Sequence, residues 1–413
     1  MIDLLCTMFT ERAPEILQWI ERAAQGLPLP FYTSADLRDS GVKAACVDLN
    51  MFPAGFNNLC ETFTARSVHH VGEWLERRFD GAPHQRVLIV PEAHTRNLFY
   101  NSNVKALCEL LTNAGLQATV AALAVEGEPL HSALTTFDGQ SVPVLPVRRA
   151  GARIVGANGE MFDWILLNND LATGAIEWLR CLDQPVIPPM CLGWHRRRKS
   201  VFFECYAAVV DEFAKAFSLD PWLLSTCNDV VTGVDFSAQE GLERVAISVT
   251  ALLERIQRKY DEYKVKRAPQ VFVKNNAGTY GMGIMVVKSV EDVLTMNRRA
   301  KNKMATGKGG VPIHEVLLQE AIPTRTRRKD VVTEPVVYMI GTNVIGMFLR
   351  ANPERGDVDN LNAKGMTFYR YCSLQPGRVP EECVGTSASQ ALYNVLSQLA
   401  VIAAARESVI TCG

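Results

Sequence analysis

Gln270-Val-Phe-Val-Lys-Asn-Asn-Ala-Gly-Thr-Tyr-Gly-Met-Gly-Ile-Met-Val-Val-Lys288 is the stretch that decides the expected fold. Two short runs of β-branched and aromatic residues flank a loop with glycines at positions 278, 281 and 283, which predicts a strand–loop–strand hairpin. Glycines let backbone N–H groups turn toward one point and approach phosphate oxygens closely. Lys274 adds a positive charge at the end of the first strand. The stretch therefore predicts a flap over nucleotide phosphates.

Other phosphate-binding motifs do not fit this stretch. A Walker loop places its lysine after the glycines and opens a helix, whereas Lys274 precedes the glycines and a strand follows them. A Rossmann turn also leads into a helix. Protein kinases use a similar flap, but the chain has neither an H-R-D nor a D-F-G motif. A glycine-rich hairpin without a ligand stays open as an alternative.

Downstream of the hairpin, the pattern predicts one helix followed by an antiparallel sheet. The helix covers 289–300, with Ser289 as its N-cap, and a stretch rich in lysine and glycine follows it. Predicted strands cover 316–319, 335–340 and 344–350, and a predicted helix covers 387–406. The loop 355–365 is rich in carboxylate and amide oxygens, which suit magnesium or, alternatively, a solvated turn.

The first part of the chain alternates strand-like and helix-like segments, which predicts a largely parallel, doubly wound sheet. Predicted strands cover 86–90, 118–123 and 163–167; predicted helices cover 66–79 and 104–111, and two longer helices follow at 200–217 and 239–263. Ligands bind beyond the carboxyl ends of parallel strands. Polar clusters follow two of these strands: Glu92, His94, Arg96 and Asn97 after one, and Asn168, Asn169 and Asp170 after the other.

Length, charge and cysteine usage exclude several classes of protein. The 413 residues suit two or three domains, and the net charge of −1 provides no field that would draw the chain to nucleic acid or a membrane. We find no apolar run of the length of a membrane helix, and an acid, Asp3, stands where a signal peptide is basic. The eleven cysteines form no C-x-x-C pair, so we expect reduced, mostly structural thiols in a cytoplasmic protein, one of which could be redox-regulatory.

Several strings resemble known families. Residues 185–199, with the basic run Arg196–Lys199, resemble the strand, loop and lysine that open the ATP-grasp region of glutathione synthetases. Residues 316–323 look like the strand and adenine hinge of that fold, and the loop 355–365 resembles a glutathione synthetase loop. The ordered set, roughly 185–365, looks like ATP-grasp. One departure is that no strand with a glu-x-asn metal motif follows Tyr371.

Four further strings resemble a small proteobacterial family of ATP-grasp-type glutamate–cysteine ligases, nearly from end to end. They are Asp48–Asn58, Pro91–Asn97, Val273–Ile284 and Asp357–Gly365. The resemblance implies an α/β protein with an N-terminal substrate-binding domain at 1–184 and an ATP-grasp domain at 185–413, whose flap covers about 266–312. It implies ATP and Mg²⁺ as cofactors, and a ligation of the glutamate γ-carboxylate to cysteine through an acyl phosphate.

The resemblance also implies a role for individual residues. Lys274 and Arg350 would be catalytic. The nucleotide would be held by Lys199, Lys274, Gly278, Thr279, Tyr280, Gly281, Gly283, Gln319, Glu320, Ala321 and Ile322. The amino-acid substrates would be held by Asn50, Asn57, Asn58, Glu92, Arg96, Asn168, Asn169, Asn360 and Lys364. The metal ligands would be Glu334, Asp359 and Asn362.

Three other functions stay open at this point. Another ATP-grasp ligase, such as a glutathione synthetase, would use the same chemistry on different substrates. A non-catalytic nucleotide-binding regulator would keep the fold, although intact Lys274 and Arg350 favour an enzyme. A nucleic-acid-binding protein would use the basic runs Arg196–Lys199 and Arg325–Lys329. The expected partners are small molecules, with neither nucleic acid nor membrane, and homo-oligomerisation is left open.

Overall fold

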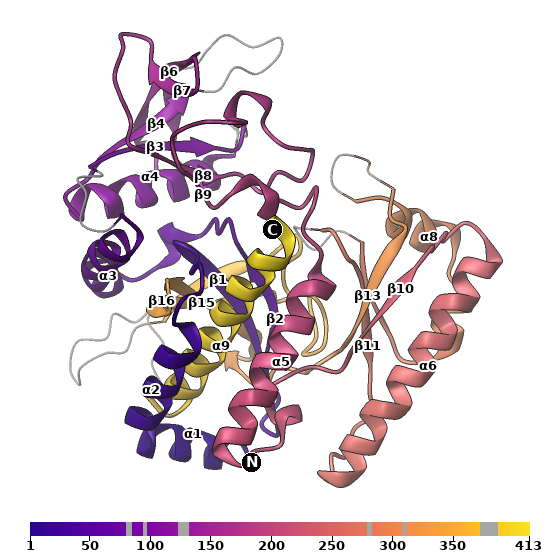
Figure 1. Ribbon diagram of the computed structural model, residues 1–413. Coiled ribbons are helices and arrows are strands. Elements are labelled where there is room, and N and C mark those ends of the chain that lie inside the picture. The colour runs from indigo at the N-terminus through magenta and orange to yellow at the C-terminus, as the bar shows by residue number, and fades with distance from the viewer. Residues whose placement is uncertain are drawn as a thin grey trace.

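A mixed α/β fold of three sheets and their covering helices is seen in the computed structural model (Figure 1). The structure describes residues 1–79, 85–93, 97–122, 132–278, 283–307, 310, 312–371 and 387–413. The central sheet lies between a mostly parallel sheet, at the top of the view, and a third sheet at the right (Figure 1).

The central sheet joins the two ends of the chain. Its antiparallel strands are ordered β17 (Thr367–Tyr371), β16 (Asn343–Ala351), β15 (Val331–Ile340), β1 (Tyr32–Asp39) and β2 (Ala44–Asn50), and β14 (Arg327–Arg328) pairs with β15. Because β1 pairs with β15, Asp36 lies opposite Val336. Strands on both sides of residue 184 therefore share one sheet, and the predicted domain boundary there stays a prediction.

One face of the central sheet is apolar and packs on helices. Side chains alternate between the faces of a strand, so Ala35, Leu37, Val337 and Leu349 all point to this face. The helix α9 (Ser387–Cys412) crosses it (Figure 1) and in turn contacts three other helices. These are α1 (Ile2–Glu11), α2 (Ala13–Ala24) and α5 (Lys199–Phe217). The burial of this face anchors the sheet.

Helix α9 is the one candidate membrane span among the described residues, by length and composition. An 18-residue window within Ser389–Cys412 has a mean hydropathy of 1.4, and 67% of that window is buried inside the fold. Leu392, Leu396 and Leu399 are fully buried in the same core as the central sheet. Its apolar character is thus accounted for by its packing, as in the core helix of a globular protein.

The second sheet is mostly parallel, as the sequence predicts. Its strands are ordered β5 (Ala133–Thr135), β6 (Ser141–Ala150), β4 (Gln117–Ala122), β3 (Arg86–Pro91), β8 (Trp164–Asn168) and β9 (Val186–Ile187), with β7 (Arg153–Gly156) paired to β6. Only the pairings of β5 and β7 with β6 are antiparallel. Glu92 directly follows β3, and the predicted polar residues Asn168, Asn169 and Asp170 lie at the end of β8.

The helices of this sheet lie on one face, which differs from the doubly wound prediction. Both α3 (Glu61–Phe79) and α4 (Leu98–Asn113) pack on the face of Ile89, Val120 and Trp164. Among the described residues, the opposite face is covered by β7 and by the short 3-10 helix Glu177–Leu179 instead. The sequence pattern shows that strands and helices alternate, but not which face each helix covers.

The third sheet contains the predicted hairpin. Its antiparallel strands are ordered β10 (Asn228–Thr232), β13 (Glu315–Glu320), β11 (Val271–Asn275) and β12 (Ile284–Val287), and α6 (Gln239–Glu262) packs on it. The strand–loop–strand prediction is confirmed, because β11 pairs with β12. The single predicted helix 289–300 is wrong: α7 (Val290–Leu294) and α8 (Arg298–Ala305) replace it, with the Asn297 side chain capping the second.

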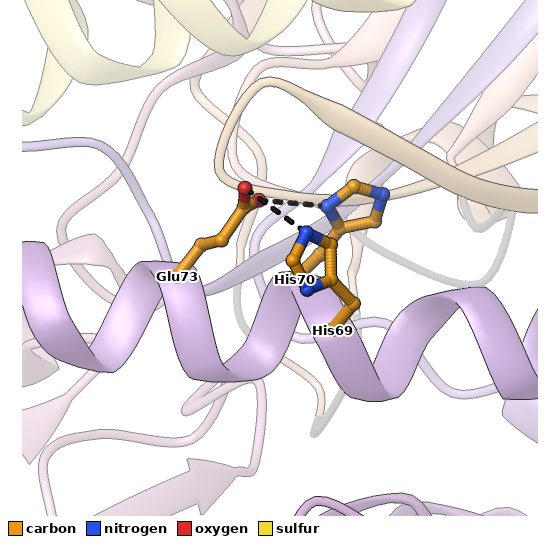
Figure 2. A group of neighbouring side chains, drawn as sticks. All are labelled: His69, His70 and Glu73. Carbon is orange, nitrogen blue, oxygen red and sulfur yellow. Dashed lines mark hydrogen bonds and ion pairs between the residues drawn. The ribbon is translucent and has the colours of Figure 1, made fainter.

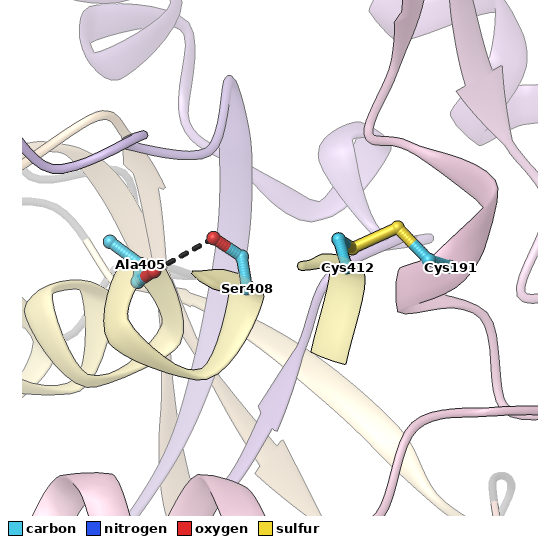
Figure 3. The surroundings of a disulfide bond; sticks show 4 residues. All are labelled: Cys191, Ala405, Ser408 and Cys412. Carbon is cyan, nitrogen blue, oxygen red and sulfur yellow. Dashed lines mark hydrogen bonds between the residues drawn. A yellow bond between two sulfur atoms is a disulfide. The ribbon is translucent and has the colours of Figure 1, made fainter. Parts of the chain in front are cut away.

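A disulfide bond links Cys191 to Cys412, which corrects the expectation that all thiols are reduced (Figure 3). Cys191 lies in the short 3-10 helix Met190–Leu192, and Cys412 ends α9. The two cysteines are 221 residues apart in sequence, and their Cα atoms are 5.5 Å apart. Sequence spacing cannot reveal such a pair, because only the packing of α9 brings the two thiols together.

We expect that reduction of this disulfide will lower the thermal stability of the protein. A bridge that closes so long a loop constrains the unfolded chain, and its loss typically lowers the free energy of unfolding by about 2–4 kcal/mol. Thermal melts with and without dithiothreitol measure the effect, and Cys412→Ser should melt at one temperature in both buffers. The control is Cys181→Ser, which removes an exposed free thiol and should melt like the parent chain. Identical melts of the parent chain in both buffers would contradict the prediction.

Candidate functional site

A cavity of about 150 Å³ lies where the three sheets meet. The central sheet contributes Ser34, Asp48, Asn50 and Arg350; the parallel sheet contributes Glu92 and Asp170 from the loops after β3 and β8; the third sheet contributes Asn275, Gly278 and Ile284. Seven of the predicted site residues line this cavity together: Asn50, Asn58, Glu92, Lys199, Gly278, Arg350 and Asn362. Segments from positions 50 to 362 thus form one site.

Two buried lysines lie beside one carboxylate, Asp48. The Lys199 Nζ donates a hydrogen bond to Asp48 Oδ1 at 2.5 Å. The Lys274 Nζ donates to Gln319 Oε1 at 2.5 Å and to the carbonyl oxygen of Val47 at 3.2 Å. That carbonyl is accessible because the register of β1 and β2 shifts at Val47. Both lysines were predicted, but Asp48 was not assigned a role, since nothing in its local sequence shows that it lies between them.

The electrostatics of this group suit an anionic ligand. Burial lowers the pKa of Lys274 to about 8, against the attraction of Asp48. Burial alone would raise the pKa of Asp48, but the nearby charges of Lys199 and Lys274 outweigh it and lower that pKa. Asp48 therefore stays ionised, while the charged form of Lys274 is only weakly favoured. A phosphate oxygen at this lysine would favour its charged form strongly.

Arg350 is held in a buried ion-pair cluster on the same sheet. Its Nη1 donates to Asp36 Oδ2 at 2.7 Å and to Glu334 Oε1 at 2.9 Å. Arg38 donates from Nε to the other oxygen of Glu334 at 2.5 Å. Burial would raise the pKa of Glu334, but the two arginines lower it, whereas burial raises the pKa of Asp36. The cluster fixes the orientation of the Arg350 guanidinium at the wall of the cavity.

The three predicted metal ligands do not come together, and this corrects the proposed ligand set. Both oxygens of Glu334 already accept from arginines. Asp359 accepts from the backbone N–H of Gly356 and lines a different cavity, of about 660 Å³. Only Asn362 faces the central cavity. The sequence could not separate these residues, because neighbouring positions in one loop turn toward different cavities.

Other oxygen donors in the central cavity fit magnesium better. Asp48, Glu92 and Asp170 line it, together with the amide side chains of Asn50, Asn58 and Asn362. Magnesium takes oxygen ligands, commonly one or two carboxylates together with water and phosphate oxygens. The donor chemistry of the cavity therefore fits the metal that the resemblance implies.

The predicted adenine hinge is buried and already hydrogen-bonded. Gln319 holds Lys274, and Glu320 Oε2 accepts from Lys43 Nζ at 2.7 Å. The backbone N–H groups of Glu320 and Ala321 donate to the carbonyl oxygens of Cys227 and Gln270, and Ile322 is buried. A nucleotide base could not use these two N–H groups without breaking the bonds between strands. Lys43, which also lies 4.0 Å from the Trp222 ring centroid, is a further buried cation that the sequence did not single out.

The predicted substrate residues divide into several groups. Asn168 has a structural role, which corrects the prediction: its amide donates to the Tyr32 hydroxyl and the Pro53 carbonyl and accepts from Tyr100 and Asn103. Four other predicted substrate residues do not line the cavity. Asn169 accepts a hydrogen bond from the Leu171 N–H in a turn, and Asn360 is hydrogen-bonded to Asn362. Asn57 is half-buried and Lys364 is exposed. His94, Arg96, Thr279, Tyr280 and Gly281 lie outside the described residues.

Gly283 and the basic run 196–199 have mainly structural contacts. Gly283 has a φ of +62° and accepts from the N–H of Asn275, so its conformation closes the base of the hairpin. Arg197 is buried and forms a bidentate pair with Glu407 of α9, at 2.7 and 2.9 Å. Lys199 is bound to Asp48. Two of the four basic residues therefore point inward, which weakens the nucleic-acid alternative.

Comparison with known proteins gives a family and a close structural match. The sequence profile of the family described as glutamate–cysteine ligase matches residues 7–408. A solved structure from Methylobacillus flagellatus KT, provisionally described as a gamma-glutamylcysteine synthetase, is 41% identical, covers 98% of this chain and 96% of that chain, and superposes with a TM-score of 0.87. No curated protein matches. A D-alanyl-alanine synthetase A from Vibrio cholerae O1 is 11% identical over 66% of this chain and 68% of that chain, and its TM-score of 0.33 is too low to bear on the fold.

We expect Glu334→Gln to destabilise the protein strongly. The change leaves Arg38 without its charged partner, and breaking a buried pair in this way typically costs about 3–5 kcal/mol. Denaturant unfolding measures the free energy. The matched control is Glu212→Gln, which breaks a surface pair with Arg406 and should cost at most about 1 kcal/mol. Equal, small losses for both variants would show that the buried cluster does not stabilise the central sheet.

Proposed function

Because this chain belongs to the glutamate–cysteine ligase family, we propose that it joins the γ-carboxylate of glutamate to the amine of cysteine through an acyl phosphate. The products would be γ-glutamylcysteine, ADP and phosphate, and the family implies the use of ATP. The observation that carries the mechanism is the pair of buried lysines beside Asp48. Lys199 and Asp48 line the cavity where the three sheets meet, and Lys274 lies beside Asp48 without lining that cavity.

The reaction needs a group that makes the carboxylate oxygen a leaving group. Transfer of the γ-phosphoryl group of ATP to the γ-carboxylate oxygen breaks the bond to ADP and forms the acyl phosphate. The amine of cysteine then attacks the acyl carbon, the C–N bond forms, phosphate leaves and the amine loses its proton. For such transfers, a protein mainly positions the reactants and neutralises the charge on the phosphates.

The two lysines suit that role. In the structure, Lys199 pairs with the Asp48 carboxylate, whereas Lys274 donates to two neutral acceptors, the Gln319 amide oxygen and the Val47 carbonyl. Phosphate oxygens would give Lys274 a stronger anionic partner than the neutral Gln319, and binding would restore the full charge that burial disfavours. The backbone around Gly278, at the cavity wall, is available to approach the same phosphates closely.

Arg350 would steady the transferring phosphoryl group. Asp36 and Glu334 hold it from behind, so little reorganisation is needed when charge develops in the cavity. Magnesium, when bound, would neutralise charge on the nucleotide phosphates, and carboxylates that line the cavity, Asp48, Glu92 and Asp170, would supply oxygen ligands. The third sheet with its hairpin, facing the central sheet across the cavity, supports the proposal of an ATP-grasp arrangement.

The proposed reaction can be tested directly by its dependence on the two amino-acid substrates. We expect ADP release to require glutamate and cysteine together, and mass spectrometry to find γ-glutamylcysteine as the product. Omission of either amino acid should leave only slow ATP hydrolysis. Full turnover with γ-glutamylcysteine and glycine, and none with glutamate and cysteine, would instead identify a glutathione synthetase activity. A cytoplasmic location, which this substrate set favours, stays a prediction.

The pH dependence of the rate tests the role of Lys274. Its pKa of about 8 means that it is charged below this pH and neutral above it. If the charged form holds phosphate, kcat/KM for ATP should fall as the pH rises through about 8. Lys274→Arg keeps its charge throughout this range, so its residual activity should lack this fall, and Lys274→Ala should be inactive at every pH. An unchanged pH profile in the arginine variant would remove Lys274 from phosphate binding.

A further inference from the structure

A cluster of two histidines and one glutamate lies on α3, away from the central cavity (Figure 2). His69 and His70 are consecutive, and Glu73 follows four and three residues later, so one helix face carries all three side chains. His70 Nδ1 lies 2.9 Å from Glu73 Oε2, and His69 Nε2 lies 3.3 Å from Glu73 Oε1. One ligand atom from each residue fits within 4.8 Å of the other two.

Part of this cluster is held in place by another element. The Nδ2 of Asn343, the first residue of β16, donates to Glu73 Oε2 at 3.3 Å. The side chains of His70 and Glu73 are 24% and 36% exposed, whereas that of His69 is 75% exposed. Two ligands are therefore partly fixed before a metal arrives, and the third is reachable from solvent.

We propose that His69, His70 and Glu73 form a binding site for a divalent transition-metal ion, of which Zn²⁺, Ni²⁺ and Cu²⁺ are the best matches. Imidazole nitrogens suit these ions, whereas magnesium prefers oxygen ligands alone. Two nitrogens and one carboxylate oxygen supply three ligands, and water from the exposed side completes the coordination. Asn343 acts as an outer partner that orients the carboxylate.

The site is separate from the chemistry of the proposed ligase. Glu73 and Asn343 line a larger cavity of about 1170 Å³, between α3, the segment 24–31 and the β15–β16 turn. None of the three ligands lines the central cavity. A metal at this site would link three side chains of α3, the helix that contacts β16, and it should stabilise the folded state by RT ln(1 + c/Kd), where c is the concentration of free metal.

The test is a titration of the full, untagged chain with Zn²⁺ alone, after treatment with a chelator. We expect one equivalent to bind, and the melting temperature to rise with zinc. The double variant His69→Ala/His70→Ala should lose this equivalent, and Asn343→Ala should weaken binding by about tenfold, the effect of losing an outer partner. Circular dichroism checks that the variants are folded; the matched control Glu76→Gln, on the same helix, should bind zinc like the parent chain.

Two results would overturn the proposal. In the first, the double histidine variant still binds zinc and Cys181→Ser does not, so that the zinc site is the exposed thiol of Cys181. The absence of any bound equivalent in the parent chain would show that the cluster is only a hydrogen-bonded surface group. A Co²⁺ spectrum separates the sites independently, since thiolate ligation adds intense near-ultraviolet charge-transfer bands that a nitrogen and oxygen site lacks.

Discussion

The ion pairs of Arg350 with Asp36 and Glu334 are the interaction on which the central sheet depends. Arg350 and Asp36 are 314 residues apart in sequence, and Arg38 adds a second arginine to Glu334 across the same strands. Desolvation makes such a cluster expensive, and it is tolerated only where geometry and hydrogen bonds are good. A shift of β1 against β15 would leave buried charges unpaired, so the cluster specifies the register that joins the two ends of the chain.

The same sheet separates two environments. Its apolar face packs on α9 and anchors the fold, while its other face changes along the strands from aromatic residues to charges. Tyr338 and Phe348 pack toward the parallel sheet, and Glu334 and Arg350 follow on the same strands. The central cavity lies at this change, where the strands hold charged side chains beside a wall of aromatic residues. Such a place gives electrostatic interactions more weight than an exposed surface does.

Most of the charges in and around the cavity are paired within the protein. Lys199 and Lys274 lie beside Asp48, Lys43 pairs with Glu320, and Arg350 pairs with Asp36 and Glu334. The phosphates of the proposed nucleotide would therefore replace protein acceptors as partners of these cations, rather than bind to cations that have no partner. The Arg197–Glu407 pair and the Cys191–Cys412 bond connect the segment before Lys199 to α9, so the position of this lysine is tied to the main core.

The sequence alone determined the hairpin of β11 and β12 and the largely parallel arrangement of β3, β4 and β8, and it singled out Lys199, Lys274 and Arg350 as candidate site residues. These features are local, because a few consecutive residues are enough to show glycine spacing, strand periodicity and a charge at the end of a strand. Only the tertiary structure decided that Asp48 lies between two lysines, that Asn168 is structural, that Glu334 serves Arg38 and Arg350 rather than a metal, and that Cys412 meets Cys191. Each of these depends on contacts between residues more than a hundred positions apart or, for Glu334 and Arg350, on the pairing of two strands. The pattern of neighbours along the chain does not contain that information.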